Sequence, residues 1–133
     1  MTKLALLALV LGFSPSAIAQ VIESGSHSST GYIKSDGTIE SSSHSTVGYI
    51  KGDTIENASH STIGYIKGET VENGSHSTVG YVKSDGTVEN ASHSTLGYVK
   101  SDGTVENSSH STIGYAKGVR KDWAAVAFFF VKF

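Results

Sequence analysis

The chain has 133 residues, with 10 Lys and Arg against 12 Asp and Glu, a formal net charge of −2 at pH 7, and no Cys. This charge balance excludes the basic surface that binds nucleic acid, and the lack of Cys excludes disulfides, thiolate nucleophiles and cysteine zinc sites. Because 38% of the residues are hydrophobic and only 17% are charged, we predict one folded domain rather than a disordered chain.

Residues 1–19 have the order of a secretory signal peptide: a basic residue, an apolar stretch over residues 4–13, and a small-residue cleavage site that ends at Ala19. Ser14-Pro15 interrupts the apolar stretch well before the roughly 20 residues of a membrane-spanning helix. We expect cleavage before Gln20 and no transmembrane helix in the mature chain. The expected location is the bacterial periplasm, the cell surface or the medium.

Residues 20–117 consist of tandem repeats in which Gly-Tyr-apolar-Lys recurs every 16 or 17 residues. The full unit reads Thr-(Ile/Val)-Glu-x-x-Ser-His-Ser-Thr-(Ile/Val/Leu)-Gly-Tyr-(Ile/Val)-Lys. Disordered chains do not keep β-branched and aromatic residues in fixed register, so the period predicts a folded repeat architecture. The repeated glycines are Gly31, Gly48, Gly64, Gly80, Gly97 and Gly114.

The joints between repeats predict β-hairpin turns. Lys-Ser-Asp-Gly-Thr is typical of a three-residue loop with Gly in the left-handed position, and Lys-Gly-(Asp/Glu)-Thr is typical of a two-residue type II′ turn. Pairing outward from the first turn places Tyr32 opposite Glu40. The predicted aliphatic pairs are Ile33 with Ile39, Ile50 with Ile55, Ile66 with Val71, Val82 with Val88, and Val99 with Val105.

Hairpins of this size are not stable alone, so they must share one core. We predict an all-β, quasi-symmetric closed ring with five or six hairpins, because closure limits exposed strand edges; an open solenoid is the alternative. Five hairpins are intact, and the unpaired halves at residues 21–23 and 114–117 can pair to close the ring. Strict alternation would place Val47 and its equivalents on the Tyr face, unless the neighbouring Gly bends the strand.

Residues 118–133 leave the repeat and end in an aromatic segment that starts at Trp123. We predict a capping strand that fills the shared core and belongs to the same domain as the repeats, with a helix as the alternative over residues 123–127. A terminal Phe is also typical of outer-membrane barrels. Membrane strands need about 9–11 residues with alternating lipid-facing positions, which the repeats do not offer.

The export signal, the Ser-His-Ser-Thr-(Ile/Val)-Gly-Tyr-(Ile/Val)-Lys units, the Asp-Gly turns and the ending Lys-Asp-Trp-Ala-Ala-Val-Ala-Phe-Phe-Phe together resemble the five-fold β-flower family of small exported bacterial proteins. The resemblance covers essentially the whole mature chain. It implies a quasi-symmetric all-β fold with hairpin petals, and it supplies no catalytic residues. A sixth Gly-Tyr copy at Gly114 departs from five-fold counting.

Two repeated side chains are candidate binding residues. Converging imidazoles bind zinc, copper or nickel or respond to pH, although ring-related residues usually diverge, and a structural hydrogen bond is the simpler interpretation. Repeated aromatic faces are typical of multivalent glycan binding, with cross-strand packing as the simpler interpretation. The candidates are His27, His44, His60, His76, His93 and His110 for a metal, and Tyr32, Tyr49, Tyr65, Tyr81, Tyr98 and Tyr115 for a glycan.

The repeated glutamates do not predict an active site, because glycoside hydrolysis needs two carboxyl groups in different environments and symmetry gives each copy the same one. We interpret them as a solvated charged rim: Glu23, Glu40, Glu56, Glu72, Glu89 and Glu106. The sequence therefore predicts a non-enzymatic structural or binding module without a cofactor, with a glycan or another cell-surface polymer as the candidate ligand. The alternatives are a metal-binding or pH-responsive module and a self-associating scaffold or outer-membrane-associated protein.

Overall fold

The computed structural model describes residues 19–133, in which twelve short strands form one closed antiparallel barrel. Strands that are consecutive in sequence are neighbours throughout, and β1 and β12 complete the circle. The strands are β1 (Ala19–Ser24), β2 (Ser29–Lys34), β3 (Thr38–Ser41), β4 (Thr46–Lys51), β5 (Thr54–Asn57), β6 (Thr62–Lys67), β7 (Thr70–Asn73), β8 (Thr78–Val82), β9 (Thr87–Asn90), β10 (Thr95–Val99), β11 (Thr104–Asn107) and β12 (Thr112–Tyr115).

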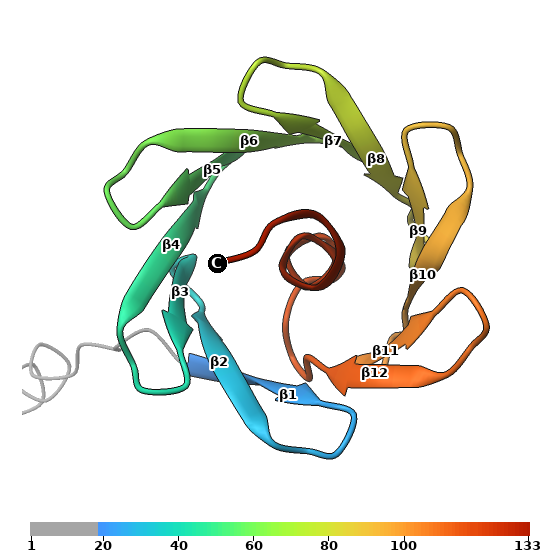
Figure 1. The fold of residues 1–133 in the computed structure, drawn as a ribbon, viewed down its shortest axis with the longest axis horizontal. Helices are drawn as coiled ribbons and strands as arrows, with labels where there is room; N and C mark the ends of the chain where they lie inside the picture. Colours follow the sequence, from blue (N-terminus) through green and yellow to red (C-terminus); the bar gives the residue numbers. More distant parts are fainter. Residues whose placement is uncertain (1–18) are drawn as a thin grey trace, which may run out of the picture.

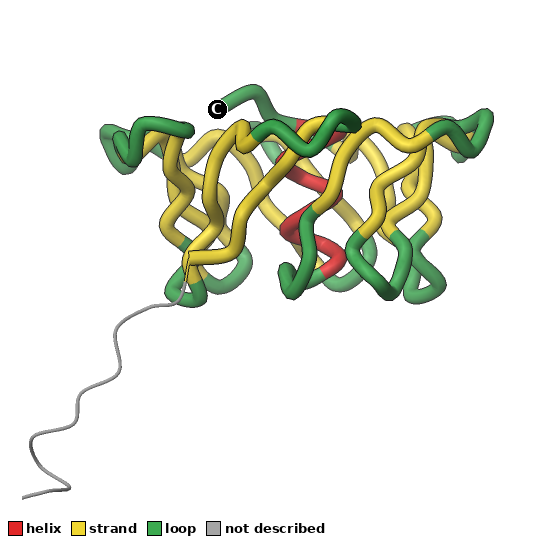
Figure 2. The backbone as a smooth tube through the Cα atoms, turned by 90° about the horizontal axis from the view of Figure 1, so that it is seen from below, coloured by secondary structure: helices red, strands yellow, loops and turns green. Residues whose placement is uncertain are grey.

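Six petals surround a central helical segment (Figure 1). The strands run between two ends of the ring, with the Lys-turn-Thr joints at one end and the Ser-His-Ser loops at the other (Figure 2). The Ser-His-Ser loops lean outward. Each repeat thus contributes one outward loop, and the six loops together form the rim of the ring.

The predicted hairpin register is confirmed. Tyr32 pairs with Glu40 and Ile33 pairs with Ile39 between β2 and β3. The other four predicted aliphatic pairs also face each other. The register is the same for both turn lengths because both kinds of joint connect the same Lys and Thr, so loss of one turn residue leaves the pairing unchanged. These aliphatic side chains point into the ring and form its buried core.

The two half-hairpins close the ring, as the sequence predicted. Glu23 of β1 pairs with Tyr115 of β12, and Ser24 pairs with Gly114. The pair Glu23 and Tyr115 reproduces the Glu40 and Tyr32 pair inside the chain, so the sixth hairpin is assembled from segments far apart in sequence. The ring therefore has six repeat units, and the open solenoid is excluded.

A β-bulge explains why Val47 and its equivalents do not lie on the Tyr face, as strict alternation would require. Between β9 and β10, Thr95 pairs with Glu89 while Gly97 pairs with Val88, so Leu96 is the extra residue of the bulged strand. Such a bulge rotates one residue relative to the alternating pattern. The five aliphatic residues at this position therefore pack against the core instead of facing solvent with Tyr: Val47, Ile63, Val79, Leu96 and Ile113.

The prediction of a C-terminal capping strand is wrong. The segment forms a short α-helix, α2 (Lys121–Ala125), that continues as a π-helical turn, η1 (Val126–Phe130), inside the ring. A closed barrel offers no free strand edge, so a segment inside it must satisfy its backbone hydrogen bonds within itself, which a helix does. The alternative of a helix and the core-filling role are both correct, since Ala124, Ala125 and Val126 are fully buried.

The predicted signal peptide lies almost entirely outside the described residues, which begin at Ala19, the first residue of β1. Among the residues that the structure describes, no helix has the length and apolar character needed to cross a bilayer.

Candidate functional site

Each outward loop is a tight turn that holds a histidine in the left-handed backbone region. The backbone N–H of His60 donates to the carbonyl oxygen of Asn57, and the Asn57 N–H donates to the carbonyl oxygen of Ser61, both at 3.0 Å. This is a type I turn followed by a left-handed residue, the same loop class that uses Gly37 in the Lys-Ser-Asp-Gly-Thr joints. All six histidines have φ between 66° and 68°.

The imidazole in each loop stacks on a tyrosine from the preceding repeat. His60 lies 4.1 Å from Tyr49 between ring centroids, with an interplanar angle of 14°. Its Nδ1 donates a hydrogen bond of 2.8 Å to Oε1 of Glu56, the cross-strand neighbour of Tyr49. The six stacks are nearly identical, with centroid distances of 4.0 to 4.2 Å.

A lysine completes each group. Lys51 Nζ lies 4.0 Å from Oε1 of Glu56 and 5.0 Å from the centroid of the Tyr49 ring. We call each set of Tyr, Glu, His and Lys a rim cluster. The six rim clusters are Tyr32-Glu40-His44-Lys34, Tyr49-Glu56-His60-Lys51, Tyr65-Glu72-His76-Lys67, Tyr81-Glu89-His93-Lys83, Tyr98-Glu106-His110-Lys100 and Tyr115-Glu23-His27-Lys117.

The interpretation of the glutamates as solvated is wrong. The Glu40 side chain is only 8% exposed, and the carboxylate is held by His44 at 2.9 Å and by Lys34 at 3.0 Å. Its neighbours cover it because the histidine loop folds back over the hairpin. The imidazoles, in contrast, are exposed, with side-chain exposures of 50% to 65%.

Hydrogen bonding in the clusters stabilises the ionised carboxylates. The hydrogen bond from His44, followed by that from Lys34, lowers the pKa of Glu40 below its ordinary value, and burial opposes this shift. His76 and His110 in the same way lower the pKa values of Glu72 and Glu106. The glutamates of these three clusters therefore stay ionised to a lower pH than a glutamate without such partners.

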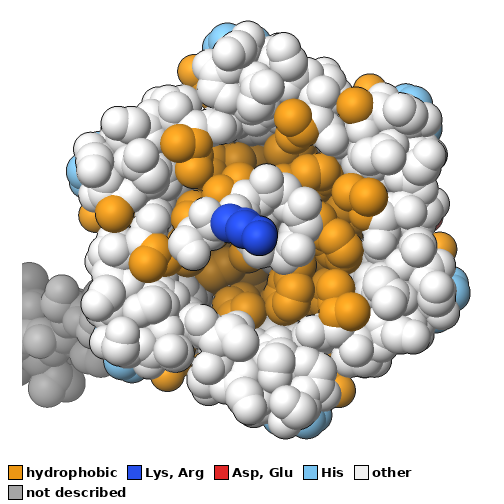
Figure 3. Space-filling view, viewed as in Figure 1, with side chains coloured by type: hydrophobic (Ala, Val, Ile, Leu, Met, Phe, Trp, Pro, Cys, Tyr) orange, Lys and Arg blue, Asp and Glu red, His pale blue; other side chains and the backbone are white. Residues whose placement is uncertain are grey.

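The ring places the six histidines apart, one at the outer margin of each petal (Figure 3). In residues 19–133, no group of three or more His, Cys, Asp or Glu side chains is close enough to hold a metal ion. The imidazole Nδ1 atoms face glutamates of their own clusters rather than a common centre. The tyrosines lie on the outer surface, half-buried, with one ring face covered by His.

A family model for the 5-fold beta-flower protein matches residues 19–132, nearly the whole described chain. The chain belongs to the β-flower family. The β-flower family is not a known enzyme family. No curated protein and no solved structure matches the chain. This β-flower protein carries six petals, so the five-fold description of the family does not give its repeat number.

Sequence reasoning found every member of the rim clusters but not their contacts. The pairing of Tyr with Glu followed from the turn register, whereas the stacking of His on Tyr did not. One signal was present: the loop Asn57-Ala-Ser-His60-Ser has the length of the Asp-Gly loop, with His where that loop has Gly. Asn, Asp and His are the side chains most enriched in left-handed turns among residues other than Gly.

Proposed function

We propose that this β-flower protein is a non-catalytic binding module that holds a repetitive glycan of the bacterial cell envelope through its six rim clusters. The observation that supports the proposal most strongly is the same exposed imidazole in all six loops, each stacked on Tyr and facing outward. The proposed export signal would bring the protein to such a polymer.

Backbone strain supports a role for the imidazole itself. A residue with a Cβ in the left-handed region costs roughly 1–2 kcal/mol relative to Gly. Gly occupies the equivalent position in the Lys-Ser-Asp-Gly-Thr joints of the same protein, with φ of 90° to 93°. The outward loops keep His at this cost in six copies, because its contacts with Tyr and Glu offset the strain and hold the imidazole in a fixed, exposed position.

The exposed surface of a rim cluster suits a sugar. One face of the imidazole rests on Tyr, which leaves the other face for the C–H face of a pyranose ring. The lysine ammonium and the serines beside the histidine, such as Ser59 and Ser61, are exposed and can bond sugar hydroxyls. A single contact of this kind is weak, but six equivalent clusters on one rigid ring allow a polymer to bind several at once.

Co-sedimentation with insoluble polymers tests the proposal. The folded chain is mixed with peptidoglycan sacculi, chitin and cellulose, and the bound fraction is measured with and without the matching soluble oligosaccharide. We expect binding to one glycan class, competition by its oligosaccharide, and a strong decrease in a variant with His44→Gly, His76→Gly and His110→Gly.

The matched control carries Ser84→Ala and Ser101→Ala, which lie in exposed joints at the opposite end of the ring. It should bind as the unmodified chain does. Equal binding by the histidine variant and the unmodified chain, with both folded by circular dichroism, contradicts a role for the rim clusters. Absence of binding to every polymer contradicts the proposal as a whole.

A further inference from the structure

The repeated glycines form six equivalent recesses on the inner wall of the ring. A Cβ built on Gly48 would lie 2.6 Å from the ring of Phe133 and 2.8 Å from the carbonyl oxygen of Glu56. Because glycine has only a hydrogen where other residues have a Cβ, an aromatic ring can lie directly on the strand backbone here. The recesses at four positions hold rings of the central segment: Phe133 at Gly48, Phe130 at Gly80, Phe129 at Gly97 and Phe128 at Gly114.

The recess at Gly31 has no side chain against it. The three atoms nearest to a Cβ built there are backbone atoms of Glu40 and Ser41, the third of them at 3.9 Å. At Gly64, in contrast, the side chain of Ile55 lies at 3.4 Å. Gly31 lines a cavity of about 640 Å³ between the inner wall and the central segment. Figure 3 shows apolar side chains lining a hollow around the central segment.

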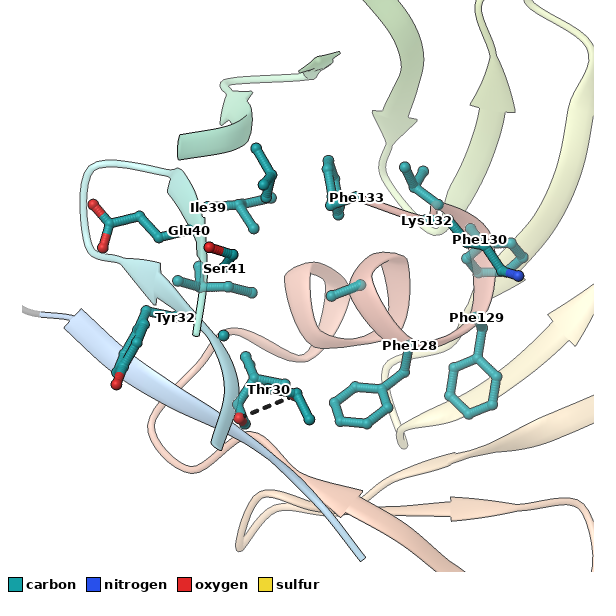
Figure 4. Close-up of a pocket in the computed structure, with 16 residues that line it drawn as sticks. Thr30, Tyr32, Ile39, Glu40, Ser41, Phe128, Phe129, Phe130, Lys132 and Phe133 are labelled. Carbon is teal, nitrogen blue, oxygen red and sulfur yellow. Dashed lines mark hydrogen bonds between the residues drawn. The ribbon is translucent and has the colours of Figure 1, made fainter. Parts of the chain in front are cut away.

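The sequence departs from the repeat at this cavity. Thr30 stands where the other five repeats have Val, Ile or Leu, and it lines the cavity beside Gly31. Its hydroxyl donates to the carbonyl oxygen of Ile22 at 3.1 Å, which leaves its oxygen free to accept a hydrogen bond. The Phe128 and Phe133 rings flank the open space, as Figure 4 shows. A smaller, polar side chain at Thr30 thus keeps open the recess that has no aromatic ring.

Among the side chains that the structure describes, the cavity has one charged group without an ion pair. Of its charged lining residues, Glu40 directs its carboxylate away from the central segment and pairs with His44 and Lys34 (Figure 4). Lys132 is the other, and no ion pair involves it within residues 19–133. Its flexible stem starts at the mouth of the cavity, so its ammonium can reach an anionic group there.

We propose that this cavity binds a small aromatic carboxylate, with its ring on Gly31 in the position that a Phe ring takes in four other recesses and its carboxylate facing Lys132. The recess suits a flat ring because four of the six equivalent recesses hold a phenyl ring against the glycine. This site is separate from the rim clusters and does not depend on the proposed glycan function.

The test is an NMR titration of the isotopically labelled mature chain, residues 20–133, with phenylacetate. We expect saturable shifts of the Gly31 and Phe128 amide signals. Thr30→Ile, which restores the side chain type of the other repeats, fills the cavity and should weaken binding by about ten-fold. Val79→Ile makes an aliphatic enlargement at the same repeat position beside the filled Gly80 recess, and should leave the affinity unchanged.

Two comparisons separate the contribution of the aromatic ring to the affinity from that of the carboxylate charge. Cyclohexylacetate has the same charge but a thicker ring, so it should bind more weakly than phenylacetate. Lys132→Gln should weaken the binding of phenylacetate by about three-fold, the size expected for an exposed ion pair. It should leave the binding of benzyl alcohol unchanged. Thr30→Ile also keeps the fold, because it introduces the repeat's own residue type.

Three results of the binding experiments would overturn the proposal, and a fourth would come from the oligomeric state. The three are no saturable shift with phenylacetate, equal affinity for phenylacetate and cyclohexylacetate, and full binding by Thr30→Ile. A concentration-dependent dimer that covers the hollow and excludes phenylacetate, seen by light scattering, would show that a second copy occupies the surface instead. That result also overturns the proposal.

Discussion

The imidazole of His60 lies parallel to the phenol ring of Tyr49 at 4.1 Å between centroids, although the two residues belong to successive repeats. The contact joins the outward loop between β5 and β6 to strand β4 across the hairpin that β4 and β5 form. The same contact between His27 and Tyr115 joins the two ends of the chain. Stacking therefore links every repeat to the next and helps to close the ring.

The left-handed backbone at His60 predicts an unusual order of substitutions. His60→Ala loses the stack and the hydrogen bond to Glu56 and keeps the strained φ, so it should destabilise the protein by about 2 kcal/mol. His60→Gly loses the same contacts but relieves the strain, and should be more stable than His60→Ala by about 1 kcal/mol. Urea denaturation measures both. An alanine variant at least as stable as the glycine variant contradicts this explanation.

The inner glycines predict a large difference between two Gly→Ala substitutions. At Gly48 a methyl group would meet both the Phe133 ring and the Glu56 carbonyl, so Gly48→Ala should cost about 3 kcal/mol or prevent folding. At Gly52, where φ is 58° and no atom lies within 4 Å, the substitution should cost about 1 kcal/mol. Thermal unfolding compares them directly. Similar losses at the two positions would mean that the recess is not tightly packed.

The central segment predicts unequal roles for its aromatic residues. Phe129→Ala removes a ring that lies on Gly97 inside the barrel, and should cost about 3–4 kcal/mol. Phe133 is 36% exposed, and Phe133→Ala should therefore cost about half as much. Chemical denaturation of both variants measures the difference. The prediction is wrong if the terminal residue proves the more costly to remove.

The lowered pKa of Glu40 predicts acid sensitivity. A carboxyl group whose pKa is lower in the folded state contributes stability above the unfolded pKa, about 4.3 for Glu, and loses it as the pH falls through the folded pKa. Stability should therefore decrease as the pH falls below about 4.3. In Glu40→Gln this decrease should be smaller, because one such carboxyl group is gone.

The control for that experiment is Asp53→Asn, in an exposed turn. As the pH falls from 7 to 2, the melting temperatures of the control and of the unmodified chain should decrease with the same profile. An equally steep acid loss in Glu40→Gln and the unmodified chain would rule out the contribution of this cluster.

Local turn chemistry explains how much of the fold was predictable. The joint at Lys34 to Thr38 specifies its own loop type, and the loop specifies which residues pair, so five hairpin registers and the closure by β1 and β12 followed from sequence. The outward turn was missed because its left-handed position is occupied by His44 rather than Gly, and the energy that holds His44 there comes from tertiary contacts with Tyr32 and Glu40.

Features that depend on closure of the ring were harder to predict from the sequence. The segment from Lys121 to Phe130 has the apolar, aromatic composition of a buried strand, and only the absence of a free edge inside the ring makes it helical. The cavity at Gly31 was also hidden. In sequence Thr30 marks this copy as different, but the recess is seen to be empty only once the central segment places its four Phe rings on other glycines.

The most direct test of the central claim measures how affinity depends on the number of intact rim clusters. His→Gly substitutions leave six, five or three clusters, and each folded variant is titrated against the polymer identified by co-sedimentation and against its soluble oligosaccharide. Multivalent binding predicts that the variant with three intact clusters loses about 100-fold in polymer affinity, while each remaining cluster binds the oligosaccharide with unchanged affinity. Polymer affinity that does not depend on the number of clusters, or that disappears with any single substitution, would contradict it.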